Sequence, residues 1–314
     1  MLPYFPFVDD TFKMVMGVKA LSDNSLIEVD KEAYREELAL KNTLLADDYD
    51  EYFQAPPETE RAQWEVVELL LKNMASRYPQ YFELDIDGDR WNWRNRLLDD
   101  EIRFVFGKRE SLPLPPLDWL GRQVQEDLLI LSGSTADGMP LVAGHLCFPN
   151  AWRLADKMGK SFLGIHHEVP LFAEYLGRSS NLLLERLKPG RPVRRVNWSI
   201  KATSRLNHLP RFAYEERLAY QHFTVENIGE RCFLRLERQT LSRLPETDAI
   251  LFTIHTYQTP MMAVAEHADY AHRIGRVVRT MPEELLLYKG MLPFVDLLLA
   301  YLATKEIDYR HEQQ

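Results

Sequence analysis

Two adjacent histidines, His166 and His167, follow a short apolar segment at residues 162–165. Neighbouring residues on a helix point about 100° apart, so at most one of the two rings faces inward. The apolar lead-in favours His166, with Phe162 one turn earlier on the same face. An inward histidine on a short segment facing a sheet suits a buried iron ligand or a proton carrier. The plainer alternative is that both rings are polar groups at a helix end.

Arg238 interrupts the alternation of an apolar strand. Counting by two from Cys232, it falls on the apolar face. A buried guanidinium without an anion is very costly, so we expect it to have a partner unless it lies at an exposed strand end. That partner is a protein carboxylate or an anionic ligand group: a substrate carboxylate, a phosphate or a haem propionate. The candidate carboxylates are Glu126, Asp127 and Glu237.

Three further side chains are candidates on strand-like segments. His255 and Tyr257 share one face of residues 249–259, where Ile254 and its apolar neighbours take the other. His255 is either a hydrogen-bond donor in a ligand pocket or a partner across strands. Asn197 shares the polar face of residues 191–200 with Arg195, and the same two interpretations hold for it.

The elements that would position these residues are predicted to be an antiparallel sheet and its helices. Apolar runs at residues 128–131 and 141–148 predict a hairpin. Asn150 is expected to cap a helix that ends before Gly159. Three more strands follow, at residues 191–200, from 232 and at 249–259. The predicted class is α+β, a five-stranded antiparallel sheet with helices on one face.

The first part of the chain has a helical pattern. Apolar residues recur at helical spacing after Asp30 and between Trp64 and Met74. Residues 85–95 have acidic spacing, but the glycine is misplaced and the twelfth position is Arg96, so we expect a surface turn and no calcium loop. The proline-rich residues 112–116 predict a boundary. Residues 1–115 are then a mostly helical extension packed on the core, and residues 116–314 are the core with C-terminal helices.

Composition narrows the function classes. The chain has 314 residues, 46% hydrophobic and 27% charged, with a net charge of -9, which argues against a nucleic-acid partner. It contains no apolar run of about 18 residues, so we expect no membrane partner and a cytoplasmic location. Cys147 and Cys232 lie in apolar strands and are too few for an iron–sulfur cluster. We find no dinucleotide fingerprint or nucleophile elbow.

Short motifs over nearly the whole chain resemble the haem-dependent oxidative N-demethylase family. They occur in the family's order, which is more specific than any single motif. The motifs are Met16-Gly17-Val18-Lys19, Val124-Gln125-Glu126-Asp127, Leu146-Cys147-Phe148-Pro149 with Trp152, Ile165-His166 with Val169-Pro170, Asn197-Trp198-Ser199, Glu237-Arg238-Gln239-Thr240-Leu241 with Leu244-Pro245, Phe252-Thr253-Ile254-His255-Thr256-Tyr257 and Tyr288-Lys289-Gly290.

The resemblance implies a core similar to a PAS sensor domain, with haem b between sheet and helices. Carried over residue by residue, it implies His166 as the proximal iron ligand and Arg238 as a propionate or pocket anchor. Asn197 and Phe162 would complete the cofactor site. His255 and Tyr257 would be the catalytic residues of the distal side.

The resemblance also implies a reaction. With haem b and O₂, the methyl carbon of a small methylated amine would be hydroxylated, and the carbinolamine would release formaldehyde. Electrons would come from a separate NAD(P)H-dependent flavin and iron–sulfur reductase, because the chain has no flavin or NAD motif. The alternative is a non-catalytic PAS-type sensor of haem or another small molecule, since one fold serves several functions.

Overall fold

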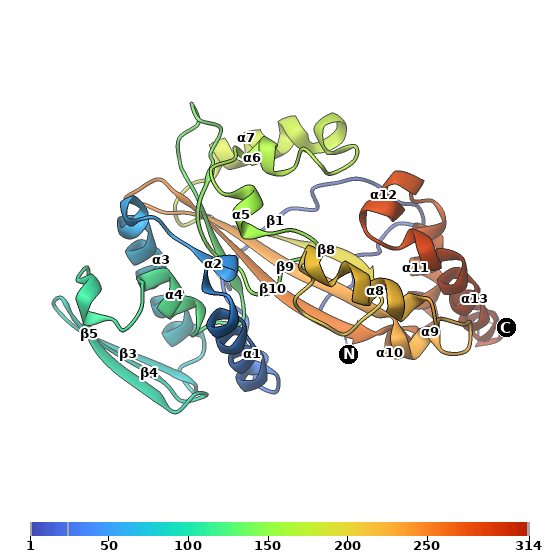
Figure 1. Ribbon diagram of the computed structural model, residues 1–314, viewed down its shortest axis with the longest axis horizontal. Coiled ribbons are helices and arrows are strands. Elements are labelled where there is room, and N and C mark those ends of the chain that lie inside the picture. The colour runs from blue at the N-terminus through green and yellow to red at the C-terminus, as the bar shows by residue number, and fades with distance from the viewer. Residues whose placement is uncertain (1, 24, 313–314) are drawn as a thin grey trace.

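The main element is a seven-stranded antiparallel sheet in the order β1-β8-β9-β10-β6-β7-β2 (Figure 1). The computed structural model describes residues 2–23 and 25–312, with side chains to residue 305. The α+β class and the antiparallel sheet are confirmed. The strands are β1 (Lys19–Ala20), β2 (Phe53–Gln54), β6 (Asp127–Leu131), β7 (Leu141–His145), β8 (Val193–Lys201), β9 (Phe233–Arg243) and β10 (Ile250–Pro260).

The predicted number of five strands is wrong. The five expected strands correspond to β6 to β10, and β1 and β2 add one strand at each edge. Each of these two has only two residues, which is too short for an alternating pattern to reveal. The first expected strand, β6, pairs with the last, β10, so the sheet joins segments that are far apart in the sequence.

Alternation along the strands gives the sheet two distinct faces. One face, called the α6 face after the helix α6 (Phe162–Ile165) that lies over it, carries Arg195 and Asn197 of β8, which lie opposite Gln239 and Glu237 of β9. The Arg238 face carries that arginine, beside His255, Tyr257, Trp198 and Leu236. The two sets of alternating residues match those predicted from the sequence. What covers each face was not predictable from alternation.

Helices cover both faces of the sheet, so the expectation of helices on one face is wrong. The α6 face lies beneath α5 (Leu154–Lys157), α6 (Phe162–Ile165), the π-helical turn η3 (Ala173–Gly177) and α7 (Arg178–Arg186), drawn at the top of Figure 1. The N-terminal and C-terminal helices pack on the Arg238 face through two separate apolar clusters. None of the helices in the described part of the chain is long and apolar enough to cross a membrane.

The N-terminal and C-terminal layers contain most of the helices. The N-terminal ones are α1 (Tyr34–Asp47), α2 (Tyr49–Tyr52), η1 (Pro57–Thr59), α3 (Glu60–Arg77), η2 (Arg109–Ser111) and α4 (Pro116–Gly121). After β8 come η4 (Pro210–Phe212), α8 (Ala213–Tyr220) and α9 (Ile228–Arg231). The last are α10 (Met261–Ala265), α11 (Ala268–Arg279), α12 (Glu283–Tyr288), η5 (Leu292–Phe294) and α13 (Val295–Glu312).

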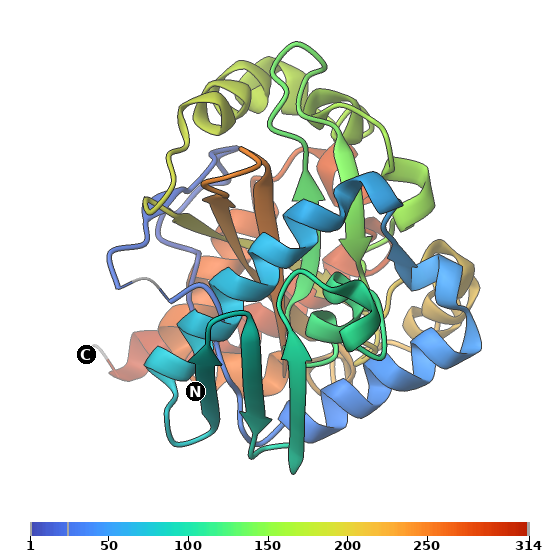
Figure 2. The ribbon, with the colours of Figure 1, turned by 90° about the vertical axis from the view of Figure 1, so that its left-hand side faces the viewer.

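A second sheet was not predicted. Its strands are β3 (Phe82–Asp87), β4 (Arg90–Asn95) and β5 (Asp100–Val105), and it lies beside α3 in Figure 2. The expected surface turn is therefore a hairpin whose tip is Gly88, which has a positive φ of 61°. Trp91 and Trp93 alternate on β4 and are buried, and the Trp93 ring stacks on Phe82 at 5.4 Å.

Candidate functional site

His166 is held at the end of α6 by local interactions. Ser161 caps this helix, because its Oγ accepts a hydrogen bond from the Gly164 amide at 3.1 Å. The Nδ1 atom of His166 lies 2.9 Å from the carbonyl oxygen of Phe162. Its ring stacks on Phe172, with the two centroids 4.4 Å apart and the planes inclined by 13°. These contacts fix the position and the rotation of the imidazole.

The hydrogen bond to Phe162 also fixes the tautomer of His166. A carbonyl oxygen can only accept, so Nδ1 carries the hydrogen and donates it. Burial lowers the pKa of His166, although the Phe162 carbonyl opposes the shift, so the ring is neutral at pH 7. The Nε2 atom therefore presents a lone pair. A histidine that ligates a metal through one nitrogen commonly donates its other N–H to a carbonyl.

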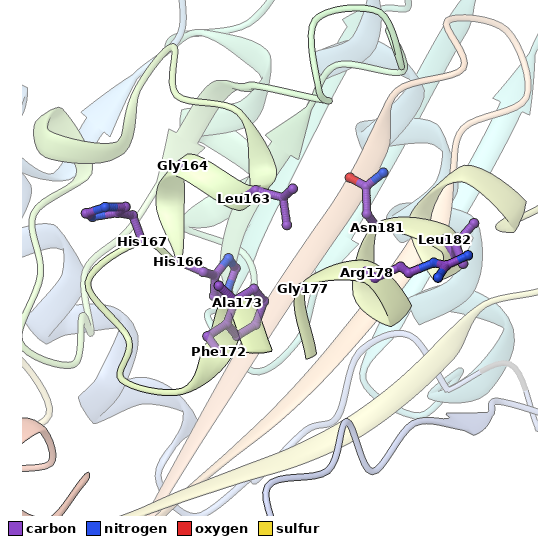
Figure 3. A pocket seen from close by; sticks show the side chains of 10 residues that line it. All are labelled: Leu163, Gly164, His166, His167, Phe172, Ala173, Gly177, Arg178, Asn181 and Leu182. Carbon is purple, nitrogen blue, oxygen red and sulfur yellow. The ribbon is translucent and has the colours of Figure 1, made fainter. Parts of the chain in front are cut away.

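A cavity of about 670 Å³ lies beside His166, between α6 and the segment η3–α7 (Figure 3). This volume falls in the range of roughly 300–1,000 Å³ that small-molecule and cofactor sites occupy. Figure 3 shows the two histidine rings pointing in different directions, with His166 beside Phe172. The residues that line the cavity are Leu163, Gly164, His166, His167, Phe172, Ala173, Gly177, Arg178, Asn181 and Leu182.

Glu237 is a carboxylate held on the α6 face of the sheet. Its oxygens accept hydrogen bonds from Arg235 Nε at 3.1 Å, Asn150 at 3.0 Å, Asn197 at 3.2 Å and Gln239 at 3.1 Å. Burial alone would raise the pKa of Glu237, but Arg235 and the amide donors outweigh it and lower the pKa. The side chain is therefore an ionised carboxylate on the sheet, and the predicted site residue Asn197 is one of its donors.

Two further cations lie near this carboxylate. Lys289 donates a hydrogen bond from Nζ to the Trp198 carbonyl at 2.6 Å, and burial lowers the pKa of Lys289 to about 8. Arg195 points from β8 on the α6 face, where burial lowers its pKa while Glu237 opposes the shift. The charges of Arg195 and of Lys157 contribute to the lowered pKa of His166, after burial.

Arg238, His255 and Tyr257 lie on the opposite face from His166. The Arg238 guanidinium donates to the carbonyls of Ser25 and Leu26, and its Nε lies 3.0 Å from a carboxylate oxygen of Glu28. Its ion-pair partner is thus a protein carboxylate, though none of the three suggested from the sequence. The structure brings Phe162 and Asn197 to the face of His166, and does not bring these three residues there.

His255 and Tyr257 are also satisfied by protein carboxylates. The Tyr257 hydroxyl donates to Glu28 at 2.6 Å, and His255 Nδ1 lies 2.9 Å from Glu126 Oε1. Burial by itself lowers the pKa of His255, but Glu126, together with Glu37 and Glu28, outweighs burial, so the pKa is raised. The pKa of Glu126 is lowered, because His255 outweighs the opposing effect of burial.

This pair makes stability depend on pH. A raised histidine pKa stabilises the fold below the unfolded value of 6.5, and that contribution is lost as the pH rises through the folded pKa. The lowered pKa of Glu126 adds stability above the unfolded pKa of 4.5, and this contribution is lost as the pH falls through the folded pKa. We expect His255→Gln to destabilise most between about pH 4.5 and 6.5. Urea unfolding from pH 5 to 9 measures this. If the free energies of unfolding of wild type and variant changed with pH in parallel, the pair would not cause the pH dependence. His267→Gln, at an exposed position, is the control.

A second cluster of possible metal ligands lies elsewhere. Atoms of Asp127, His145 and Cys147, all buried, lie within 4.8 Å of one another. However, the Lys41 ammonium lies 3.7 Å from Asp127, whose Oδ1 also accepts the Cys147 amide at 2.8 Å. Burial raises the pKa of the Cys147 thiol, which keeps it protonated and a poor ligand. Lys41 already supplies the positive charge here, so we assign these side chains to the core.

Sequence reasoning missed the polar cluster around Asn197, in which Glu237 accepts from Asn197 and Gln239 and Lys289 lies near; none of these residues lines the cavity. Alternation from Cys232 places Glu237 and Gln239 on the face opposite to Arg238, and that pattern could have grouped them with Asn197. Lys289, the residue directly after α12, reaches the sheet through tertiary packing alone. Its tripeptide, Tyr288-Lys289-Gly290, is one of the motifs that carry the family resemblance.

These features define a class of protein: an α+β fold in which short helices cover an antiparallel sheet and line a partly open cavity beside a neutral histidine. The family model for haem-dependent oxidative N-demethylase, alpha subunit-like, matches residues 17–299. The chain belongs to this family. Its description indicates haem dependence and an oxidative demethylase-like enzyme, and the words alpha subunit imply at least one further subunit.

Proposed function

We propose that this chain is the haem-binding subunit of an oxidative N-demethylase. The observation that carries the proposal is His166, whose Nδ1 is bound to the Phe162 carbonyl beside a cavity of about 670 Å³. A fixed, neutral imidazole with a free Nε2 fits an axial ligand of haem iron. The helices between β7 and β8 cover one face of the sheet, which supports a PAS-like core.

His166 would hold the iron of haem b, with Phe162 and Phe172 against its ring, while Asn197 lies on the α6 face of the sheet. When bound, haem b supplies the redox chemistry with O₂ that oxidises a methyl group. The protein's part is to fix the imidazole and to shield the site with apolar side chains such as the buried Phe172. Arg238, His255 and Tyr257 have protein partners on the other face, and we propose no haem contact for them.

Glu237 orders the polar part of the α6 face, and we propose no contact with the amine for it. Asn150, Asn197, Arg235 and Gln239 hold both of its oxygens, and it does not line the cavity. The methylated amine would bind in the cavity beside His166, against apolar residues such as Phe172 and Leu182. After hydroxylation of the methyl carbon, the carbinolamine breaks its C–N bond and releases formaldehyde and the demethylated amine.

The remaining parts of the proposal concern partners and organisation. Electrons would come from a separate NAD(P)H-dependent flavin and iron–sulfur reductase subunit, in line with the subunit named in the family description. Residues 1–115 would form an extension on the Arg238 face, and residues 116–314 the catalytic core. The cytoplasm remains our expected location.

One experiment tests this function directly. Freshly expressed protein should show a Soret band, and NAD(P)H should reduce the haem only when a reductase is added. With both, dimethylamine should yield formaldehyde in proportion to the NAD(P)H consumed. Absence of haem from protein expressed with excess haem would refute the proposal. Haem binding without formaldehyde, for a panel of methylated amines, would favour a sensor.

A further inference from the structure

Arg195 is a half-buried cation without an ion-pair partner among the residues that the structure describes. Its side chain is half-buried and its Nε atom has no solvent contact and no hydrogen-bond partner. Within residues 2–23 and 25–305, whose side chains the structure describes, no hydrogen bond or ion pair of its guanidinium is found. A buried N–H donor without an acceptor costs free energy, which a ligand that accepts from it would recover.

The position of Arg195 directs it toward the proposed ligand site. On β8 it lies two residues after Val193, which belongs to the same apolar cluster as Phe162 and Ile165 of α6. It lies opposite Gln239 of β9. The next pair along these strands on the same face is Asn197 and Glu237. Arg195 therefore stands where the apolar part of this face, under α6, meets its polar part.

Protein carboxylates do not neutralise this arginine. Glu237 is near enough to affect its pKa, yet no ion pair joins them and Glu237 already accepts four hydrogen bonds. The ion-pair partner of Glu237 is Arg235, whose Nε lies 3.1 Å from Glu237 Oε1. Lys289 adds a further positive charge nearby. This part of the face therefore carries more positive than negative charge.

We infer that Arg195 binds a carboxylate group of the ligand that occupies the α6 face. A guanidinium presents paired N–H donors that match the two oxygens of a carboxylate. The inference rests on the proposed function, in which two ligands are available. The carboxylate belongs either to a haem propionate or to an amine substrate that itself carries a carboxylate.

The test compares Arg195→Gln with Arg194→Gln. Arg194 is the neighbouring residue on the same strand, has the same charge, and points to the Arg238 face, where its guanidinium lies over the Tyr4 ring at 5.6 Å. Apo-protein of each variant and of wild type is titrated with haem b and with haem dimethyl ester, whose propionates are esterified. The Soret band reports binding, and no turnover is needed.

If Arg195 binds a propionate, Arg195→Gln should weaken haem b binding by roughly tenfold or more and change dimethyl ester binding by less than about twofold. Arg194→Gln should leave both affinities unchanged. Equal losses for haem b and its ester in Arg195→Gln would mean that the arginine only supports the fold, and would overturn the inference.

A separate titration tests the second possible source of the carboxylate, the amine substrate. Holo-protein is titrated with N-methylglycine and with dimethylamine, and binding is followed by the shift of the Soret band. If the carboxylate belongs to the substrate, Arg195→Gln should weaken N-methylglycine binding roughly tenfold, with haem b and dimethylamine unaffected. A variant that matches wild type in both arms overturns the inference while the haem function stands. A wild-type protein that binds no haem refutes the proposed function itself.

Discussion

Replacing His166 by alanine is expected to abolish the Soret band of the protein, or to weaken haem binding by more than about 100-fold. The change removes the Nε2 lone pair that the Phe162 carbonyl holds in place, and no other histidine is fixed in this way at the cavity among the described residues. Apo-protein titrated with haem b, followed by absorbance, measures the effect.

His167→Ala is the matched control, because it removes the adjacent ring, which Figure 3 shows pointing elsewhere. We expect this variant to keep its Soret band, and both variants to keep their helical circular dichroism. Should His166→Ala bind haem as wild type does, the iron ligand must be another residue. A loss in His167→Ala alone would exchange the two assignments.

The parts of the fold predicted from the sequence are those that local patterns determine. Alternation along β10 correctly separated Ile254 from His255 and Tyr257, because side chains on a strand point to opposite faces in turn. The apolar stripe of α3 likewise marked a helix. Each of these predictions depends only on residues within a few positions of one another.

Alternation cannot say which layer covers which face. His166 reaches one face through α6, whereas the segment of residues 25–28 reaches the other and binds Arg238 there. Glu28 and Arg238 are 210 positions apart, so no local pattern connects them. For that reason Arg238 could be recognised as a buried charge that needs an anion, while its partner could not be identified.

Competing signals explain two further differences. The acidic spacing of residues 85–95 suggested a turn, and it obscured the alternation of Trp91 and Trp93 that marks β4. Asn150 was expected to cap a helix, but α5 begins only at Leu154 and the Asn150 amide donates to Glu237. A buried carboxylate gains more from this donor than a four-residue helix gains from a cap.

Arg238→Leu is expected to lower the free energy of unfolding by about 3–5 kcal/mol, because it leaves Glu28 without its ion pair and two carbonyls without their donor. Urea denaturation measures the loss. Arg191→Leu, at an exposed position, should change stability by less than about 0.5 kcal/mol. Arg238→Lys should recover only part of the loss, since an ammonium lacks the planar fork of donors.

The same variant separates a structural role from a role in the cofactor site. Arg238 lies on the face opposite to His166, so the folded fraction of Arg238→Leu should bind haem b with nearly the wild-type affinity. Unchanged stability would mean that the buried ion pair contributes nothing. A selective loss of haem affinity, with stability intact, would mean that an effect crosses the sheet from Arg238 to the α6 face.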